Sequence, residues 1–156
     1  MEKILLAVDD SKKAEKAAEK AGKLAGALEA EVTIITVIDA VNIHHSLYST
    51  YSHLEVDKLR EQRKNKIKEE GEKILRKAAN LLQGKGIKEN KITKMMKKGS
   101  PAEDICEEAE KNNYDLIILA DTGEGGVKRF LLGSTSDRVV RHAETSVMIV
   151  KWEKMK

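Results

Sequence analysis

The sequence predicts an α/β protein: a single domain built on a doubly wound, five-stranded and mostly parallel sheet with helices on both faces. Short apolar segments alternate with longer segments of helical periodicity along the whole chain, and this order is typical of parallel strands joined by helices. No internal repeat or low-complexity linker divides the 156 residues, which is an ordinary length for one domain. Residues 1–156 are therefore expected to form one unit.

Each predicted strand is a short run rich in apolar residues. The first, residues 4–8, is apolar throughout, as a strand buried on both faces requires. The other strands are expected at residues 32–38, 92–96, 116–120 and 147–150. We expect the strand order 3-2-1-4-5, in which the first and fourth strands are neighbours. In sheets of this kind, ligands bind in the crevice beyond the carboxyl ends of the strands where the order reverses.

Four helices are expected between these strands, at about residues 14–28, 53–82, 101–112 and 133–143. The second helix should end at Gly84 and Gly86, because glycines commonly follow a helix. At the start of the third helix, Ser100 is expected to cap, Pro101 to fill the first turn and Glu103 to close a capping box.

The most informative segment is the glycine-rich loop that follows the fourth strand. Four glycines lie within eleven residues, and the loop enters the fourth helix at Gly133, Ser134 and Thr135. Glycine lets the backbone approach a ligand closely, and free amides at a helix start favour an anion. A plain strand-to-helix connection would explain two glycines but not the whole pattern. The loop is therefore interpreted as a cradle for a phosphate or nucleotide.

Composition and charge argue against several classes of function. The 29 basic and 26 acidic residues are interspersed and leave a net charge of +3, so we expect no nucleic-acid partner. The single cysteine, Cys106, excludes an internal disulfide and is expected to pack in the core. There is no apolar run of about 18 residues and no room for a signal peptide before the first strand. We expect a cytoplasmic protein with no membrane partner.

Common phosphate-binding motifs are absent from the sequence. Without Gly-x-x-x-x-Gly-Lys-Ser/Thr, the chain lacks the lysine and the metal-binding hydroxyl of phosphate-loop NTPases. No Gly-x-Gly-x-x-Gly follows the first strand, which argues against a dinucleotide site.

Several short motifs together resemble the universal stress protein family, and they span essentially the whole chain. They are Ala7-Val8-Asp9-Asp10-Ser11, Thr36-Val37-Ile38-Asp39, Gly99-Ser100-Pro101, the strand at 114–120, and Gly123 followed after nine residues by Gly133-Ser134. The resemblance implies a Rossmann-like fold. Within this family, the chain resembles the ATP-binding branch. Members of that branch carry the motif Gly, two residues, Gly, nine residues and Gly-Ser/Thr.

This resemblance implies a site for ATP or another adenine nucleotide, with Mg²⁺ accompanying a triphosphate. Val37 would face the adenine edge through its backbone, and Asp9 and Ala120 would lie at the ribose. The residues expected to hold the phosphates are Gly123, Gly133, Ser134 and Thr135. The remaining expected binding residues are Ala7, Val8 and Leu119.

Two residues depart from the family pattern near this site. Ala120 stands where the family has a glycine, which adds a methyl group beside the ribose. Asp10 replaces the glycine of the usual Val-Asp-Gly-Ser turn, which adds a carboxylate at the mouth of the pocket.

Three functions remain open on the sequence. The first is a nucleotide-binding module with a regulatory role in the stress response, the second a slow ATPase or adenylyl-transferring enzyme that uses Asp9, and the third a nucleotide-free interaction protein. We favour the first and expect at most weak ATPase activity, because no nucleophile and general base stand at a revealing spacing. Asp9 is explained equally well as a carboxylate that favours a helix start.

Two further expectations concern loops and edges. The histidines and tyrosines of the polar segment after the second strand are interpreted as a loop near the pocket, with a histidine metal site as the alternative. The residues Val147, Met148, Ile149 and Val150 would form an open apolar edge, so we expect a homodimer that pairs through this last strand, as family members commonly do.

Overall fold

The computed structural model of the protein describes residues 1–39, 53–121 and 132–151. Its five strands form one sheet in the order β3-β2-β1-β4-β5, and all neighbouring strands are parallel. The strands are β1 (Lys3–Ala7), β2 (Glu31–Asp39), β3 (Ile92–Gly99), β4 (Leu116–Ala120) and β5 (Ser146–Val150). The predicted fold class and strand order are confirmed, although β3 extends three residues further than predicted.

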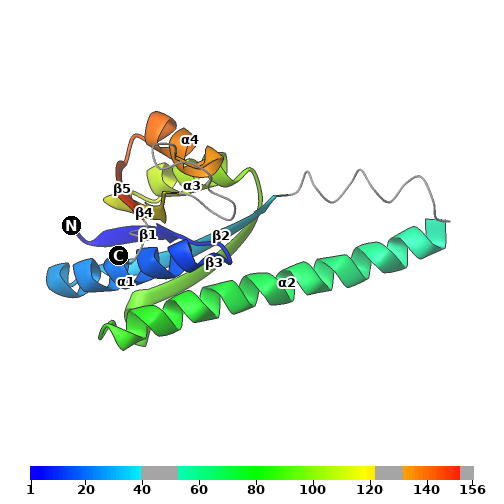
Figure 1. Ribbon diagram of the computed structural model, residues 1–156, viewed down its shortest axis with the longest axis horizontal. Coiled ribbons are helices and arrows are strands. Elements are labelled where there is room, and N and C mark those ends of the chain that lie inside the picture. The colour runs from blue at the N-terminus through cyan, green and yellow to red at the C-terminus, as the bar shows by residue number, and fades with distance from the viewer. Residues whose placement is uncertain (40–52, 122–131, 152–156) are drawn as a thin grey trace, which may run out of the picture.

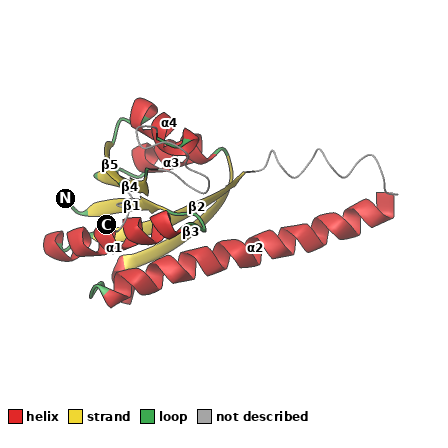
Figure 2. Cartoon of the chain, viewed as in Figure 1, coloured by secondary structure: helices red, strands yellow, loops and turns green. Residues whose placement is uncertain are grey.

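Helices cover both faces of the sheet (Figures 1 and 2). They are α1 (Lys12–Leu28), α2 (His53–Gly84), α3 (Pro101–Lys111) and α4 (Ser134–His142), with a short 3₁₀ turn at Glu89–Lys91. The helices α1 and α2 pack on one face and α3 and α4 on the other, so the sheet separates two apolar cores. This double cover explains why β1 is apolar throughout: Ile4, Leu5 and Leu6 are each 0% exposed.

Small residues bring α1 close to the sheet, as the alanine spacing predicted. The buried positions of this helix are five alanines and one glycine: Ala14, Ala17, Ala18, Ala21, Gly22 and Ala25. Ser11 is the N-cap, and its hydroxyl accepts a hydrogen bond from the backbone amide of Ala14. The start of α1 is therefore capped by the side chain of its N-cap residue.

The end of α2 follows the prediction from its glycines. The helix stops at Gly84, and Gly86 adopts a φ of 90°, a left-handed conformation that favours glycine. The amides of Gly86 and Ile87 then donate to the carbonyls of Gln83 and Leu82, which satisfies the last turn of the helix.

The start of α3 differs from the prediction. Ser100 occupies the N-cap position and Pro101 the first turn, but the Ser100 side chain makes no capping hydrogen bond. The capping box is wrong as well, because Glu103 instead accepts from the Arg138 guanidinium of α4. The nearby Gly99 is required by a close approach, since a Cβ there would collide with the buried Oδ2 of Asp104.

Cys106 lies in the core on the α3 side of the sheet, as predicted. Burial is the first cause that raises the pKa of its thiol, and the neighbouring Glu110 carboxylate adds to the effect. In the described ranges, no helix combines the length and apolarity that membrane crossing needs.

Candidate functional site

The candidate site lies beyond the carboxyl ends of β1 and β4, which are neighbours in the sheet. Their register pairs Leu6 with Ile118, so the turns that leave the two strands begin side by side. One turn leads through Asp9 into α1, and the other begins at Asp121 and leads to α4. The strand order reverses at this point, which is where ligands bind in sheets of this type.

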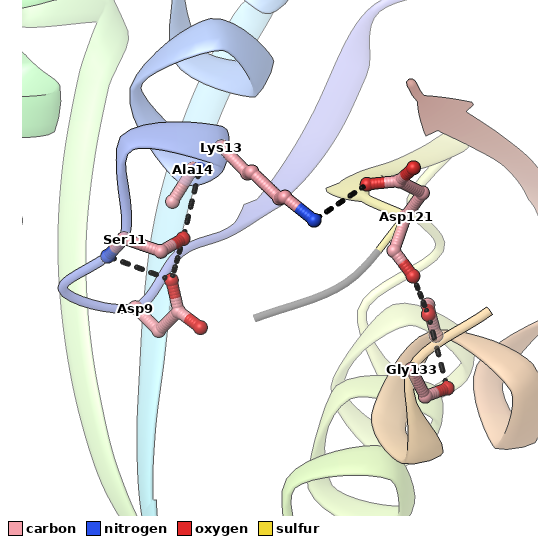
Figure 3. Close-up of polar contacts among 7 residues, drawn as sticks. Asp9, Ser11, Lys13, Ala14, Asp121 and Gly133 are labelled. Atoms are coloured by element: carbon pink, nitrogen blue, oxygen red, sulfur yellow. Dashed lines mark hydrogen bonds and ion pairs between the residues drawn. The ribbon is translucent and has the colours of Figure 1, made fainter. Parts of the chain in front are cut away.

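Asp9 holds the turn between β1 and α1 through one of its two carboxylate oxygens. Its Oδ1 accepts from the backbone amide of Ser11 at 3.0 Å and from the Ser11 hydroxyl at 2.5 Å. This contact gives Asp9 a structural role beside the N-cap of α1. The carboxylate is exposed, and in Figure 3 its second oxygen points away from Ser11.

The second turn is fixed to the start of α4 through the main chain of Asp121. The carbonyl of Asp121 accepts from the Gly133 amide at 2.8 Å and from the Ser136 hydroxyl at 2.5 Å. The Asp121 amide donates to the carbonyl of Val150 in β5. Ser136 is 3% exposed. The two ends of the glycine-rich loop are therefore joined, and the N-terminus of α4 is held at the end of β4.

Within the described residues, no side chain caps the N-terminus of α4. Gly133 is the N-cap residue, and the first helical hydrogen bond runs from the Asp137 amide to the Gly133 carbonyl. The amides of Ser134, Thr135 and Ser136 precede that bond and point out of the helix end. By contrast, Ser11 caps α1. Of the two helix starts at this end of the sheet, that of α4 is the one without a side-chain cap among the described residues, and such a start favours an anion.

Lys13 crosses between the two turns (Figure 3). It extends from the first turn of α1, and its Nζ lies 3.9 Å from Oδ1 of Asp121. The two side chains are only 24% and 23% exposed. The ion pair therefore links the start of α1 to the residue that follows β4.

Other predicted binding residues lie where the strands end. Val8 donates its amide to the Ile35 carbonyl, beyond the last register pair of β1 and β2. Val37 lies two residues further along β2, so its backbone extends past the end of β1. The side chains of Ala7, Val8 and Leu119 are buried in the two cores and leave only backbone groups for a ligand.

Some predicted features lie outside the described residues. Gly123, the first glycine of the predicted cradle, is one of them, as are His44, His45 and both tyrosines of the preceding polar segment. Across residues 1–39, 53–121 and 132–151, no group of three or more histidine, cysteine, aspartate or glutamate side chains is arranged to hold a metal ion.

Lys13, Asp121 and Ser136 were missed as site residues from the sequence. No sequence signal separates Lys13 from Lys12, which lies in the same first turn of α1 and is exposed. Asp121 and Ser136 contribute a carbonyl and a buried hydroxyl, and their pairing over fifteen positions leaves no mark in local sequence.

The arrangement suits binding of an anion better than bond cleavage. Available amides, a helix dipole and the Lys13 cation converge at one end of the crevice, while Asp9 lies at the other. Oδ1 of Asp9 accepts from the Ser11 hydroxyl, and that hydroxyl also caps α1 by accepting from the Ala14 amide, so this pair holds the helix start.

Comparison with known proteins identifies a protein family that the chain matches. Residues 1–151 match the Universal stress protein family. Universal stress protein MJ0531 of Methanocaldococcus jannaschii is 35% identical over 150 residues, which cover 96% of this chain and 82% of that protein.

Solved structures share the fold. The hypothetical protein MJ0577, the subject of a structure-based assignment of biochemical function, aligns with a TM-score of 0.75 and 28% identity over 99% of this chain and 98% of that one. A universal stress protein solved in complex with cAMP aligns with a TM-score of 0.68 over 96% of each chain. At 23% identity, this second likeness shows the fold alone.

Proposed function

Because the chain belongs to the universal stress protein family, we propose that it is a regulatory module that binds an adenine nucleotide beyond the carboxyl ends of β1 and β4. The observation that carries the proposal is the start of α4, which is uncapped and is fixed beside β4 through Asp121. A helix start of this kind offers amides and a positive dipole end to a phosphate group. That a protein of this fold holds cAMP supports the proposal.

In the proposed complex, the phosphates lie at Gly133, Ser134 and Thr135, with Gly123 as the further predicted contact. The ribose lies between Asp9 and the backbone of Ala120, and the adenine edge meets the backbone of Val37. Mg²⁺ would accompany a triphosphate, held mainly by phosphate oxygens and water, which are ligands that this ion prefers. A cytoplasmic location belongs to the same proposal.

The proposed role is to hold the nucleotide rather than to hydrolyse it. A general base must reach the proton that it removes, and Asp9 already uses one oxygen to hold its own turn. Occupancy would instead change the surface at the start of α4, which is bonded to Asp121 at the end of β4. This is the step through which a bound nucleotide could alter the partners of the protein.

The first test measures binding by titration calorimetry and by the thermal shift of the purified protein with AMP, ADP, ATP and cAMP. We expect heat and stabilisation with at least one of these nucleotides, since a ligand that binds only the folded state raises its stability. A protein that shows neither effect at millimolar concentrations of all four nucleotides would not be the proposed module.

A pair of variants tests the α4 amides directly. Ser134→Pro removes one amide hydrogen at the first helical position, where proline is well tolerated, and the extended conformation of Gly133 (φ −65°, ψ 164°) suits a residue before proline. Ser134→Ala is the matched control, because it keeps the amide and removes only the hydroxyl. We expect the proline variant to bind the nucleotide more weakly than the alanine variant, by about tenfold for one charge-assisted hydrogen bond. Equal affinities would show that the amide makes no contact with the ligand.

A further inference from the structure

The position of Lys13 in its own helix is electrostatically unfavourable. Ser11 is the N-cap of α1, so Lys13 is the second helical residue and lies at the positive end of the helix dipole. A cation in the first turn weakens a helix, whereas one in the last turn strengthens it. The charge therefore does not stabilise the start of α1, and its ion pair with Asp121 lies outside the helix.

The side chain of Lys13 points across the crevice of the candidate site. Its ammonium group approaches Asp121, which follows β4, while its backbone belongs to the element that follows β1 (Figure 3). About three quarters of each side chain is buried, so their attraction is less screened than that of a surface pair. At 3.9 Å the contact with Asp121 is an ion pair without a short hydrogen bond, and a phosphate group would be a more highly charged acceptor than this carboxylate.

The charges around the crevice explain why a phosphate would compete for this lysine. Among the described residues of the two turns, Asp9, Asp10 and Asp121 carry carboxylates, and each repels a bound phosphate. The backbone amides of α4 offset part of that repulsion. Lys13 supplies a full positive charge between the turn after β1 and the end of β4, next to the start of α4 to which Asp121 is bonded.

We propose that Lys13 is a phosphate-binding residue of this site, paired with Asp121 when the site is empty and transferred to the nucleotide phosphates when it is filled. The inference rests on the proposed function and deepens it, because it makes the site selective for the phosphorylated form of the ligand. Adenosine has no group that would draw Lys13 away from Asp121. Nucleoside di- and triphosphates carry phosphate groups that would draw it away, and they are the class of ligand that Lys13 favours.

The main chain of Asp121 would keep its place during this exchange. Its carbonyl remains bonded to Gly133 and Ser136, and its amide to Val150, because these contacts do not involve the carboxylate. Only the contact between its carboxylate and Lys13 would be exchanged. Asp121→Asn therefore removes the competing charge without removing the backbone contacts that hold α4 at the end of β4.

The test compares wild-type protein with Lys13→Met and Lys12→Met by calorimetric titration with adenosine, ADP and ATP at one salt concentration. Lys12 is the matched control, since it is the adjacent lysine in the same first turn but is exposed. We expect Lys13→Met to weaken ATP binding by about 10- to 100-fold, the range for a charge-assisted hydrogen bond. Adenosine affinity should change by less than about twofold, and Lys12→Met should bind both ligands as wild type does.

Two further variants separate a ligand role from a structural one. Lys13→Arg should keep most of the ATP affinity because it keeps the charge. Asp121→Asn should tighten ATP binding because it removes the carboxylate that competes for Lys13 and repels the phosphates. Thermal unfolding without ligand shows which variants are folded. If wild type and Lys13→Met bind ATP equally, Lys13 is not a phosphate ligand although the nucleotide site stands. If wild type binds neither adenosine nor any nucleotide, the proposed function is wrong and this inference is wrong with it.

Discussion

At the scale of single residues, the main question is whether Ala120, which stands where the family has a glycine, damages the candidate site. The sequence places a methyl group where the family has none, beside the expected ribose. In the structure, the Ala120 side chain is partly buried and packs against the core that lies on the α1 side of the sheet. The methyl group is thus accommodated by packing, and the backbone of the residue remains available to a ligand.

Ala120→Gly is therefore expected to leave nucleotide affinity within about threefold of wild type. The substitution should lower the free energy of unfolding by about 0.5–1 kcal/mol, because glycine in a strand costs conformational entropy and packs nothing. Titration calorimetry and chemical denaturation measure the two effects. A gain in affinity of tenfold or more would instead support the nucleotide-free interpretation, in which Ala120 marks a lost site.

At the scale of elements, two glycines show how closely the helices pack on one another and on the sheet. A Cβ at Gly22 of α1 would lie 2.9 Å from both Cβ and Cγ of Lys85, which are close to the backbone. A Cβ at Gly71 of α2 would lie 2.7 Å from Sδ and 2.9 Å from Cε of Met96, at the end of a flexible side chain. The neighbours of Gly22 therefore cannot move as readily as those of Gly71.

The same substitution is expected to have opposite effects at these two positions. Alanine gains roughly 1 kcal/mol over glycine in a helix, whereas overpacking costs about 1–3 kcal/mol. Gly22→Ala should be destabilising because Lys85 must shift its backbone, and Gly71→Ala should be neutral or stabilising because Met96 can rotate. Urea denaturation of both variants measures the difference, and equal losses of stability would contradict this account of the packing.

At the scale of the whole molecule, the two edges of the sheet are chemically unlike. The edge strand β3 carries three lysines, Lys94, Lys97 and Lys98, and such charges discourage pairing with another chain. The other edge strand, β5, carries no charge, and Met148 within it is 36% exposed. This contrast supports the proposal that two copies pair through β5.

Met148→Lys is expected to convert a dimer of the wild-type protein into a monomer, because it places a charge on the uncharged edge. Thr93→Lys is the matched control: Thr93 is an exposed residue on β3, and the change there should leave the mass unaltered. Sedimentation at micromolar concentration measures both. A monomeric wild-type protein, or a dimer that survives Met148→Lys, would argue against pairing through β5.

The sequence by itself determined the order of elements, the parallel sheet and the places where the chain turns at the carboxyl edge of that sheet. These features depend on local patterns: apolar runs for strands, periodic alanines for α1, and glycines that end α2. The positions of Asp9, Ala120 and Gly133 at strand ends and a helix start were predictable to the same extent, since such residues occupy fixed places once the topology is known, and their role in binding stays a prediction. The capping box of α3 failed because Glu103 found a partner on another helix, Arg138.

Only the tertiary structure decided what holds the candidate site together. The Asp121 carbonyl joins Gly133 and Ser136, and Lys13 reaches Asp121 from an element more than one hundred positions away. Such contacts depend on how β1 and β4 lie side by side, and neither segment carries a local pattern that names its partner. Local sequence fixes which groups arrive at the edge of the sheet, whereas packing fixes which of them meet.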